Sequence, residues 1–443
     1  MDRRRFLQLG ALSAVQLAAF GAGAAPRGAL RYGPLVPDPE GFLDLPAGFR
    51  YVRVQSAGDP MSDGHKVPGR LDGMCCHVDD AENYVLLRNH EIGDRQFVED
   101  ERAGGVAFPE DRVPVWREEE AVVDRTRLGG VTRVEIHRPS LLAKAPADVV
   151  RSSRMVLAGT DINCGGGKLR DGWVSCEESV SDGHGWAWFV PWRANGLGAH
   201  QRLDGWGRFR HEAITMLGDG TVYMTEDDKI GLFYRFVPAD RKNPFGPGTL
   251  SALKLPIPST HTEGQTVVEP GDTWRAEWVE IRDPSAATSR CAEQGAKAGA
   301  TRFYRGEGVC TDGNLVWFVA TKAGPVGAGQ VWELNHARRK VTLRHQVTDR
   351  TVLSMPDNLV FAPWGDVVLA EDNYDALGGA THQHLRGLGH RDGVVYPIAR
   401  NARGNPGPPG DEFAGPCFSP DGKVLFVNLQ GAADTTVAII GPW

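Results

Sequence analysis

The chain has 443 residues, and its 49 Lys and Arg against 56 Asp and Glu give a formal net charge of -7. This length allows two or three ordinary domains or one large repeat architecture, and the acidic balance argues against nucleic acid as a partner, since duplex binding needs a clustered basic face. The 55 Gly and 29 Pro are too few for a disordered chain and indicate a turn-rich globular protein.

The first 25 residues have the order of an export signal. Three arginines at 3–5 precede an apolar stretch at 9–20, and small residues follow at 22–25. The stretch is shorter than the ~20 residues that cross a bilayer, so a signal peptide is expected at 1–25 and no stable membrane anchor. The paired arginines resemble the signal read by the twin-arginine export machinery. We expect 26–443 to form one domain, periplasmic or secreted, and monomeric.

One phrase recurs along the rest of the chain: a turn, then four or five β-forming residues, then a polar end. Its six copies are 78–91 (VDDAENYVLLRNHE), 169–178 (LRDGWVSCEE), 217–228 (LGDGTVYMTEDD), 310–322 (CTDGNLVWFVATK), 361–373 (FAPWGDVVLAEDN) and 418–430 (FSPDGKVLFVNLQ). Each copy predicts a tight β-hairpin.

A second short phrase precedes each hairpin. These phrases are Asp72-Gly73-Met74, Asn163-Cys164-Gly165, His211-Glu212-Ala213, Gly306-Glu307-Gly308, Asp357-Asn358 and Glu412-Phe413-Ala414-Gly415. They lie roughly 50 or roughly 90 residues apart, and a four-stranded propeller blade takes ~40–50 residues. We therefore predict an all-β, six-bladed β-propeller, with insertions near 109–120 and 238–297 as loops on one face. The alternative is that Asp-Gly hairpins recur by chance in an antiparallel protein.

Equivalent positions in the blades of a propeller converge on its axis. Glu212, Glu307, Asp357 and Glu412 would then meet there with Cys164, and the acids that end the following strands, Glu177 or Glu178, Glu226 and Glu371, would form a second tier. Two like charges ~5 Å apart repel by about 3 kcal/mol at an effective dielectric of ~20, so such a nest needs protons or cations. Carboxylates suit Ca²⁺, whereas a thiolate suits iron or zinc, so the pattern favours a mixed metal cluster.

Arg305 lies two residues before Glu307 and could direct its planar fork at an oxyanion held by the metals. The alternative from spacing alone is an ordinary ion pair with a neighbouring acid.

At these residues the chain resembles the PhoX-type alkaline phosphatases. The matching phrases are Leu45–Phe49, Gly58–Gly64, Arg88–Glu91, Asn163–Gly166, Cys176–Glu178, Gly207–Glu212, Arg305–Gly308, Pro356–Asn358 and Glu412–Pro416. They extend over almost the whole chain after residue 45.

The resemblance implies a six-bladed propeller that holds Fe³⁺ and Ca²⁺ and hydrolyses phosphomonoesters at alkaline pH. Cys164 would bind iron, and the other implied metal ligands are Glu177, Glu212, Glu307, Asp357, Asn358, Glu371, Asp372 and Glu412. Arg305 matches the phosphate-binding arginine of the family. The family's phosphate-binding lysine has no match, and Arg154 is the candidate to replace it.

These observations predict an exported metal-dependent alkaline phosphatase that acts on a small-molecule phosphoester. Two alternatives stay open. One is a phosphodiesterase or a lactonase-type metal hydrolase, because metal propellers host several chemistries. The other is a non-catalytic propeller in which calcium rigidifies the axis and the insertions bind a partner.

Overall fold

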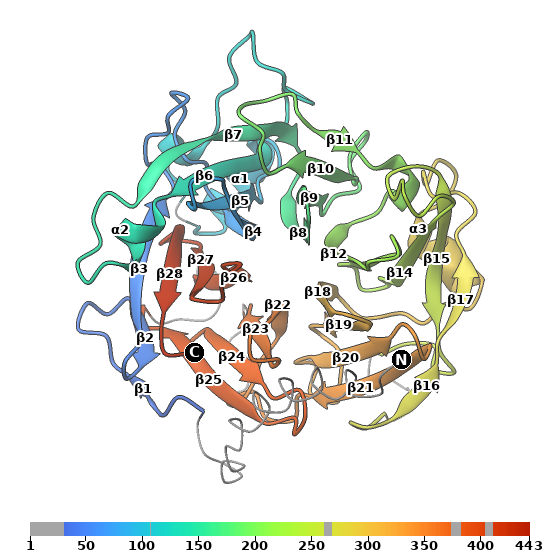
Figure 1. Cartoon of the computed structure of the whole chain (residues 1–443). Coiled ribbons are helices and arrows are strands. Elements are labelled where there is room, and N and C mark those ends of the chain that lie inside the picture. The colour runs from blue at the N-terminus through green and yellow to red at the C-terminus, as the bar shows by residue number, and fades with distance from the viewer. Residues whose placement is uncertain (1–30, 107, 261–267, 374–381, 404–410) are drawn as a thin grey trace, which may run out of the picture.

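Six antiparallel sheets stand in a ring in the computed structural model (Figure 1), which describes residues 31–106, 108–260, 268–373, 382–403 and 411–443. The predicted all-β, six-bladed propeller is therefore confirmed. The export signal predicted at 1–25 lies outside the described residues.

Each sheet is one blade, and we number the blades by the chain order of their innermost strands. Blade 1 holds β4 (Leu71–Val78), β5 (Tyr84–His90), β6 (Gly129–Ile136) and β7 (Val150–Thr160); blade 2 holds β8 (Asn163–Leu169), β9 (Gly172–Glu177), β10 (Ala187–Pro191) and β11 (Gln201–Arg202). Blade 3 holds β12 (His211–Met216), β13 (Val222–Glu226), β14 (Phe233–Pro238), β15 (Gly248–Lys254) and β17 (Glu277–Glu280). Blade 4 holds β18 (Gly306–Asp312), β19 (Leu315–Ala320), β20 (Gln330–Asn335), β21 (Lys340–Gln346) and β16 (Thr273–Arg275).

Blades 5 and 6 also take strands from the beginning of the described chain. Blade 5 holds β22 (Pro356–Phe361), β23 (Val367–Glu371), β24 (His384–Leu388), β25 (Val395–Asn401), β2 (Leu43–Pro46) and β1 (Leu35–Val36); blade 6 holds β26 (Glu412–Phe418), β27 (Val424–Gln430), β28 (Thr435–Ile440) and β3 (Arg50–Ser56). Because β3 pairs with β28, the two ends of the propeller are joined in one sheet.

The six predicted hairpins are the pairs formed by the first and second strands of the blades. In blade 2, Leu169 pairs with Gly172, so the turn between the two strands is tight. The second strands are buried along nearly their whole length, which explains their runs of apolar β-formers.

The prediction that 238–297 forms only loops is wrong in part. This segment supplies β15 and β17 to the outside of blade 3 and β16 to the outside of blade 4, followed by α3 (Cys291–Lys297). In β15 the apolar residues Leu250, Ala252 and Leu253 are buried and hold the strand on the blade. Residues 109–120 contain a 3₁₀ turn, η1 (Glu110–Arg112), after α1 (Arg95–Ala103); the remaining short elements are α2 (Arg138–Leu142) and η2 (Asp204–Trp206).

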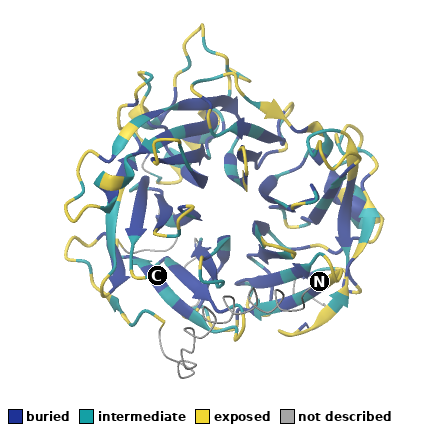
Figure 2. Ribbon diagram, in the orientation of Figure 1, coloured by how far each residue is buried: buried dark blue, intermediate teal, exposed yellow. Residues whose placement is uncertain are grey.

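The strands of the blades are largely buried (Figure 2), and their apolar side chains form core clusters between neighbouring blades. Between blades 2 and 3, for example, Trp206 and Phe236 pack with the apolar faces of β9 and β13. All seven cysteines are free thiols. Across the described ranges, no helix has the length and apolar character needed to cross a membrane.

Candidate metal centre

A one-residue bulge at the start of the innermost strand directs a side chain toward the axis in five blades. In each case the register shifts after the first residue of the strand. The second residues of these strands are Asp72, Cys164, Glu212, Glu307 and Asp357. A β-bulge bends its strand and re-aims a side chain, so the repeated bulge explains why these five residues share one direction.

Blade 6 departs from this pattern. Its bulge lies between Ala414 and Cys417, and Gly415, with a φ of 59°, takes the place that the acids have elsewhere. The acid of this blade, Glu412, comes from the first residue of β26. Glu412 therefore reaches the acidic centre from a different backbone position.

Glycine follows Asp72, Cys164 and Glu307 because the innermost strands nearly touch. A Cβ on Gly73 would lie 2.8 Å from the carbonyl oxygen of Cys164 in the next blade, and a Cβ on Gly308 would lie 2.8 Å from that of Asp357. Real Cβ atoms do not approach backbone this closely, so the close approach requires glycine at both positions.

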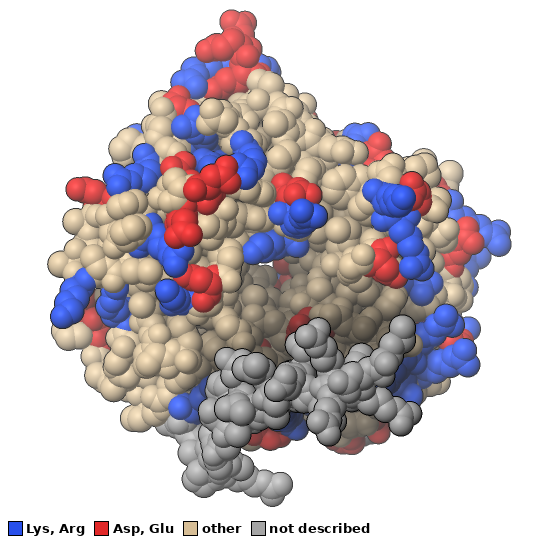
Figure 3. Space-filling view, in the orientation of Figure 1, with Lys and Arg blue, Asp and Glu red and all other residues tan. Residues whose placement is uncertain are grey.

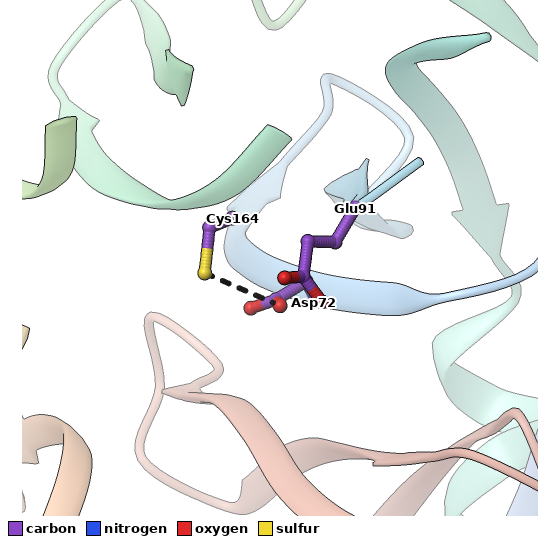
Figure 4. A group of neighbouring side chains, drawn as sticks. All are labelled: Asp72, Glu91 and Cys164. Atoms are coloured by element: carbon purple, nitrogen blue, oxygen red, sulfur yellow. Dashed lines mark hydrogen bonds between the residues drawn. The ribbon is translucent and has the colours of Figure 1, made fainter. Parts of the chain in front are cut away.

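The side chains at the axis form four overlapping groups in which the potential ligand atoms lie within 4.8 Å of one another. The groups are Asp72, Glu91 and Cys164; Cys164, Glu178 and Glu212; Glu212, Glu307 and Asp357; and Asp357, Asp372 and Glu412. Figure 4 shows the first group, in which the Cys164 thiol donates to Asp72 Oδ2 at 3.6 Å. Acidic atoms are visible in the hollow at the centre of the molecule (Figure 3).

Three of these acids directly follow the second strand of a blade. Their backbone N–H groups each donate to the carbonyl of the residue that precedes the innermost strand: Glu91 to Arg70 at 2.9 Å, Glu178 to Ile162 at 2.9 Å, and Asp372 to Met355 at 3.1 Å. This shared hydrogen bond turns the chain at the strand end and brings each carboxylate to the axis.

Glu177, one residue before Glu178, is not brought into these groups. Its carboxylate accepts from the backbone N–H groups of Asp161, Gly185 and Trp186, each at 2.9 Å, and contacts His184 Nδ1 at 2.8 Å. Successive side chains of a strand point to opposite faces, so only one of two adjacent acids can face the axis. Glu177 instead fixes the loop between β9 and β10.

Glu371 also lies outside the four groups, for the same reason. Its oxygens accept from Ser354 N at 3.0 Å and Arg386 Nε at 3.3 Å, and contact His384 Nδ1 at 3.0 Å. Asn358 is not a member either, but its Nδ2 donates to Asp357 Oδ1 at 2.8 Å and its Oδ1 accepts from Gly415 N at 2.6 Å. Asn358 thus links Asp357 to the next blade.

The two candidate arginines have different locations. Arg305 lies directly before β18, and its Nε and Nη2 donate to the two oxygens of Asp227 at 2.8 and 2.5 Å. The same Nη2 lies 3.1 Å from Glu307 Oε1, so Arg305 borders the acidic centre. Arg154 lies on β7, the outermost strand of blade 1, and the structure does not bring it to the axis.

Burial and mutual repulsion dominate the electrostatics of the centre. Burial, with a contribution from Glu91, raises the pKa of Asp72 to about 8. Burial and the charge of Asp227 raise the pKa of Glu178 to about 8. The pKa values of Glu212, Glu307, Asp357 and Glu412 are also raised well above the ordinary range, first by burial and then by neighbouring acids. Such a centre favours bound cations or protons.

The donor atoms fit a mixed set of hard and softer metal ions. Both carboxylate oxygens of Glu212 and Oδ1 of Asp72 are buried and have no hydrogen-bond partner among the described residues. A buried polar atom without a partner costs free energy, and a metal ion would remove that cost. Two groups share the Cys164 thiol, which suits iron, and the other two contain only carboxylates, which suit calcium.

Asp72 and Glu91 join the centre although the sequence did not single them out as ligands, and Glu178 joins it as one of the two alternatives, Glu177 or Glu178. Asp72 begins the first of the six short phrases, and Glu91 ends the first hairpin phrase. The repeat therefore places them at blade positions equivalent to those of Cys164 and Glu178. Glu177 and Glu178 are neighbours in one phrase. The sequence does not show which of their two side chains faces the axis.

Beyond the acids, the innermost strands line a cavity of about 420 Å³. Glycines and apolar residues such as Met74, Ile214 and Val309 line most of it, and Lys168 is the charged residue of the lining. No described acid lines this cavity, so the candidate chemistry lies with the acidic groups.

The ring of sheets, and the buried and half-buried carboxylates grouped with the Cys164 thiol at its axis, define a class of protein, the six-bladed propeller with a candidate metal centre. The family model described as "Alkaline phosphatase PhoX" matches residues 30–204 and 180–433. The chain belongs to this family, as its resemblance in sequence predicted.

Two solved structures are similar to this chain, and the first supports the fold. PhoX of Pseudomonas fluorescens, in complex with vanadate, a transition state analogue, is similar with a TM-score of 0.65 and 17% identity over 93% of this chain and 98% of that chain. A gluconolactonase of Xanthomonas campestris has a TM-score of 0.41 and 10% identity over 93% and 98%. None of the curated proteins compared with the chain matches it.

Proposed function

We propose that the protein is an exported metal-dependent phosphatase that hydrolyses phosphomonoesters at an iron and calcium centre in the propeller axis. The observation that supports this most strongly is the set of four overlapping groups built from eight carboxylates and Cys164, in a chain of the PhoX family. Export by the twin-arginine machinery, through residues 1–25, is part of the proposal.

In this proposal the four groups divide between the two metals. Cys164, with Asp72, Glu91, Glu178 and Glu212, would hold iron, and the carboxylates of Glu212, Glu307, Asp357, Asp372 and Glu412 would hold calcium. The bound ions would activate water and neutralise the charge that develops on the phosphoryl group.

The side chains of this protein then position the substrate. Arg305 would hold the nonbridging phosphate oxygens, because a guanidinium fork matches the geometry of an oxyanion. Asp227 binds both Nε and Nη2 of Arg305 and so fixes the plane of the fork. Four of the acids, Asp72, Glu178, Glu212 and Glu307, are buried, and the exclusion of bulk water there strengthens their charge interactions.

The first prediction tests this function with protein recovered from the periplasm of an exporting host and loaded with iron and calcium. We expect turnover of p-nitrophenyl phosphate, less turnover of the bis-ester, and a mass that shows loss of the first 25 residues. Cys164→Ser should lose iron and more than about 100-fold in kcat/KM, because even the loss of an outer-shell partner of a metal ligand costs 10–100-fold.

Cys310→Ser is the matched control, because Cys310 lies outside the four groups. It should keep its iron and its activity. Turnover by the loaded native chain no higher than that of a Cys164→Ser/Arg305→Ala double variant would reject the proposed function.

A further inference from the structure

An arginine directly precedes the innermost strand in three of the six blades. These residues are Arg70, Arg210 and Arg305. The carbonyl of each accepts a backbone hydrogen bond from the residue that follows the second strand: from Glu91 at 2.9 Å, from Asp227 at 3.2 Å and from Thr321 at 2.8 Å. The three arginines therefore occupy one equivalent backbone position, at the edge of the acidic centre.

Both terminal nitrogens of the Arg70 guanidinium donate hydrogen bonds to other side chains. Its Nη1 donates to Gln430 Oε1 at 2.8 Å and its Nη2 to Glu101 Oε2 at 2.5 Å, which hold its guanidinium between blade 6 and α1. Only 19% of its side chain is exposed. These contacts make Arg70 a structural link between the two elements.

Arg210 is in a different situation. Its Nη2 donates to Glu178 Oε1, and Glu178 belongs to the group that includes Cys164 and Glu212. Its Nε, like that of Arg70, is buried and has no hydrogen-bond partner within the described part of the chain, but 37% of the Arg210 side chain is exposed, against 19% for Arg70. Arg210 thus combines contact with the acidic centre, access to solvent and an unused buried donor.

Asp227 stands between Arg210 and Arg305. Its backbone N–H donates to the Arg210 carbonyl, and its carboxylate holds both Nε and Nη2 of Arg305. The two guanidinium groups therefore come from neighbouring blades, Arg210 to Glu178 of the acidic centre and Arg305 to Asp227, whose charge acts on Glu178. A guanidinium group has five N–H donors, so each arginine keeps donors for an oxyanion besides those that these acids accept.

We propose that Arg210 is a second phosphate-binding residue, which holds the oxyanion together with Arg305. This inference rests on the proposed phosphatase function. The phosphoryl group would lie between the two forks, and the unpartnered Nε of Arg210 supplies a donor that the protein alone leaves unused. Phosphate, a dianion near neutral pH, is the chemical class that two adjacent guanidinium groups and bound cations select.

The second prediction is tested by the binding of inorganic phosphate to metal-loaded protein, measured by calorimetry, together with kcat, KM and metal content. Arg210→Ala should weaken phosphate binding by about 10- to 100-fold, the usual cost of a charge-assisted hydrogen bond. KM should rise and metal content should not change. Arg210→Lys should recover part of the affinity, since it restores the charge without the fork.

Arg241→Ala is the control, because Arg241 lies in the same blade and 73% of its side chain is exposed. It should bind phosphate as the native chain does. Unchanged phosphate affinity in Arg210→Ala would overturn the inference, and so would a loss of metal, because Arg210 would then serve only to orient Glu178.

The outcomes separate this inference from the proposed function. Turnover by the native chain with unchanged phosphate affinity in Arg210→Ala would reject the role of Arg210 alone. Arg210-dependent phosphate binding without turnover would reject the phosphatase function and retain Arg210 as an oxyanion ligand.

Discussion

At the scale of single residues, neighbouring acids have different roles. Glu177 accepts three backbone hydrogen bonds, whereas Glu178 reaches the axis. Glu371 and Asp372 show the same division in blade 5. One carboxylate of each pair holds a loop to its blade and the other is available to a metal ion.

The third prediction separates these roles by substitution. Glu177→Gln should lower the free energy of unfolding by about 2–3 kcal/mol, because its amide NH₂ would face backbone donors and leave buried hydrogen bonds unmade. Glu178→Gln should lower metal content and leave the stability of the metal-free protein unchanged or higher. Urea unfolding of metal-free protein and elemental analysis measure the two effects. Metal loss in Glu177→Gln alone would contradict the assignment.

The sequence predicted which segments reach the axis but not which of two adjacent acids does. The repeated phrases located Glu212, Glu307, Asp357 and Glu412, and all four lie in the centre. The choice between Glu177 and Glu178 depends on which way each side chain points at the end of β9, and the sequence does not show this because β9 is buried on both faces. Arg154 is close to Cys164 in the chain, but the order of the strands in the blade carries it to the outer edge.

At the scale of elements, the bulged innermost strand is the unit that builds the site. It occurs in all six blades, and its close packing on the next blade sets the distance between successive acids. A Cβ on Gly165 would overlap the carbonyl of Glu212 in blade 3. The conformation of the strand and the position of the ligands are therefore coupled.

The fourth prediction concerns this coupling. Gly165→Ala should destabilise the fold by about 1–3 kcal/mol, as overpacking does, and should lower metal affinity because Glu212 must move. Gly218→Ala is the matched control: it lies in the hairpin turn of blade 3, where a Cβ would meet nothing within 4 Å. The control should change stability by less than about 0.5 kcal/mol. Equal thermal stability of the two variants would refute the coupling.

At the scale of the whole molecule, the acidic centre sets how stability depends on pH. An acid whose pKa is higher in the folded than in the unfolded protein binds more protons when folded, so stability falls as the pH rises through that interval. For Asp72 and Glu178 the interval runs from about 4 in the unfolded chain to about 8 in the folded one. Bound cations would stabilise the ionised carboxylates and oppose this loss.

The fifth prediction follows from this decrease of stability with rising pH. Metal-free protein should have a lower melting temperature at pH 8 than at pH 5, and loading with calcium and iron should raise the melting temperature more at pH 8. Calorimetry of both forms at both pH values measures the difference. A melting temperature of the metal-free form that does not fall between pH 5 and pH 8 would show that the buried acids do not titrate as proposed.

The pairing of β3 with β28 determines when the centre can form during synthesis. A ribosome releases the blades one after another, and until residues 435–440 emerge they make an open arc whose last sheet lacks a strand. Asp72 in blade 1 and Glu412 in blade 6 come to their places around one axis only when that arc closes. Capture of the ions that need the full ring is therefore a step that follows translation, and a chain truncated in its last strand would lose the centre although the acids of all six blades are present.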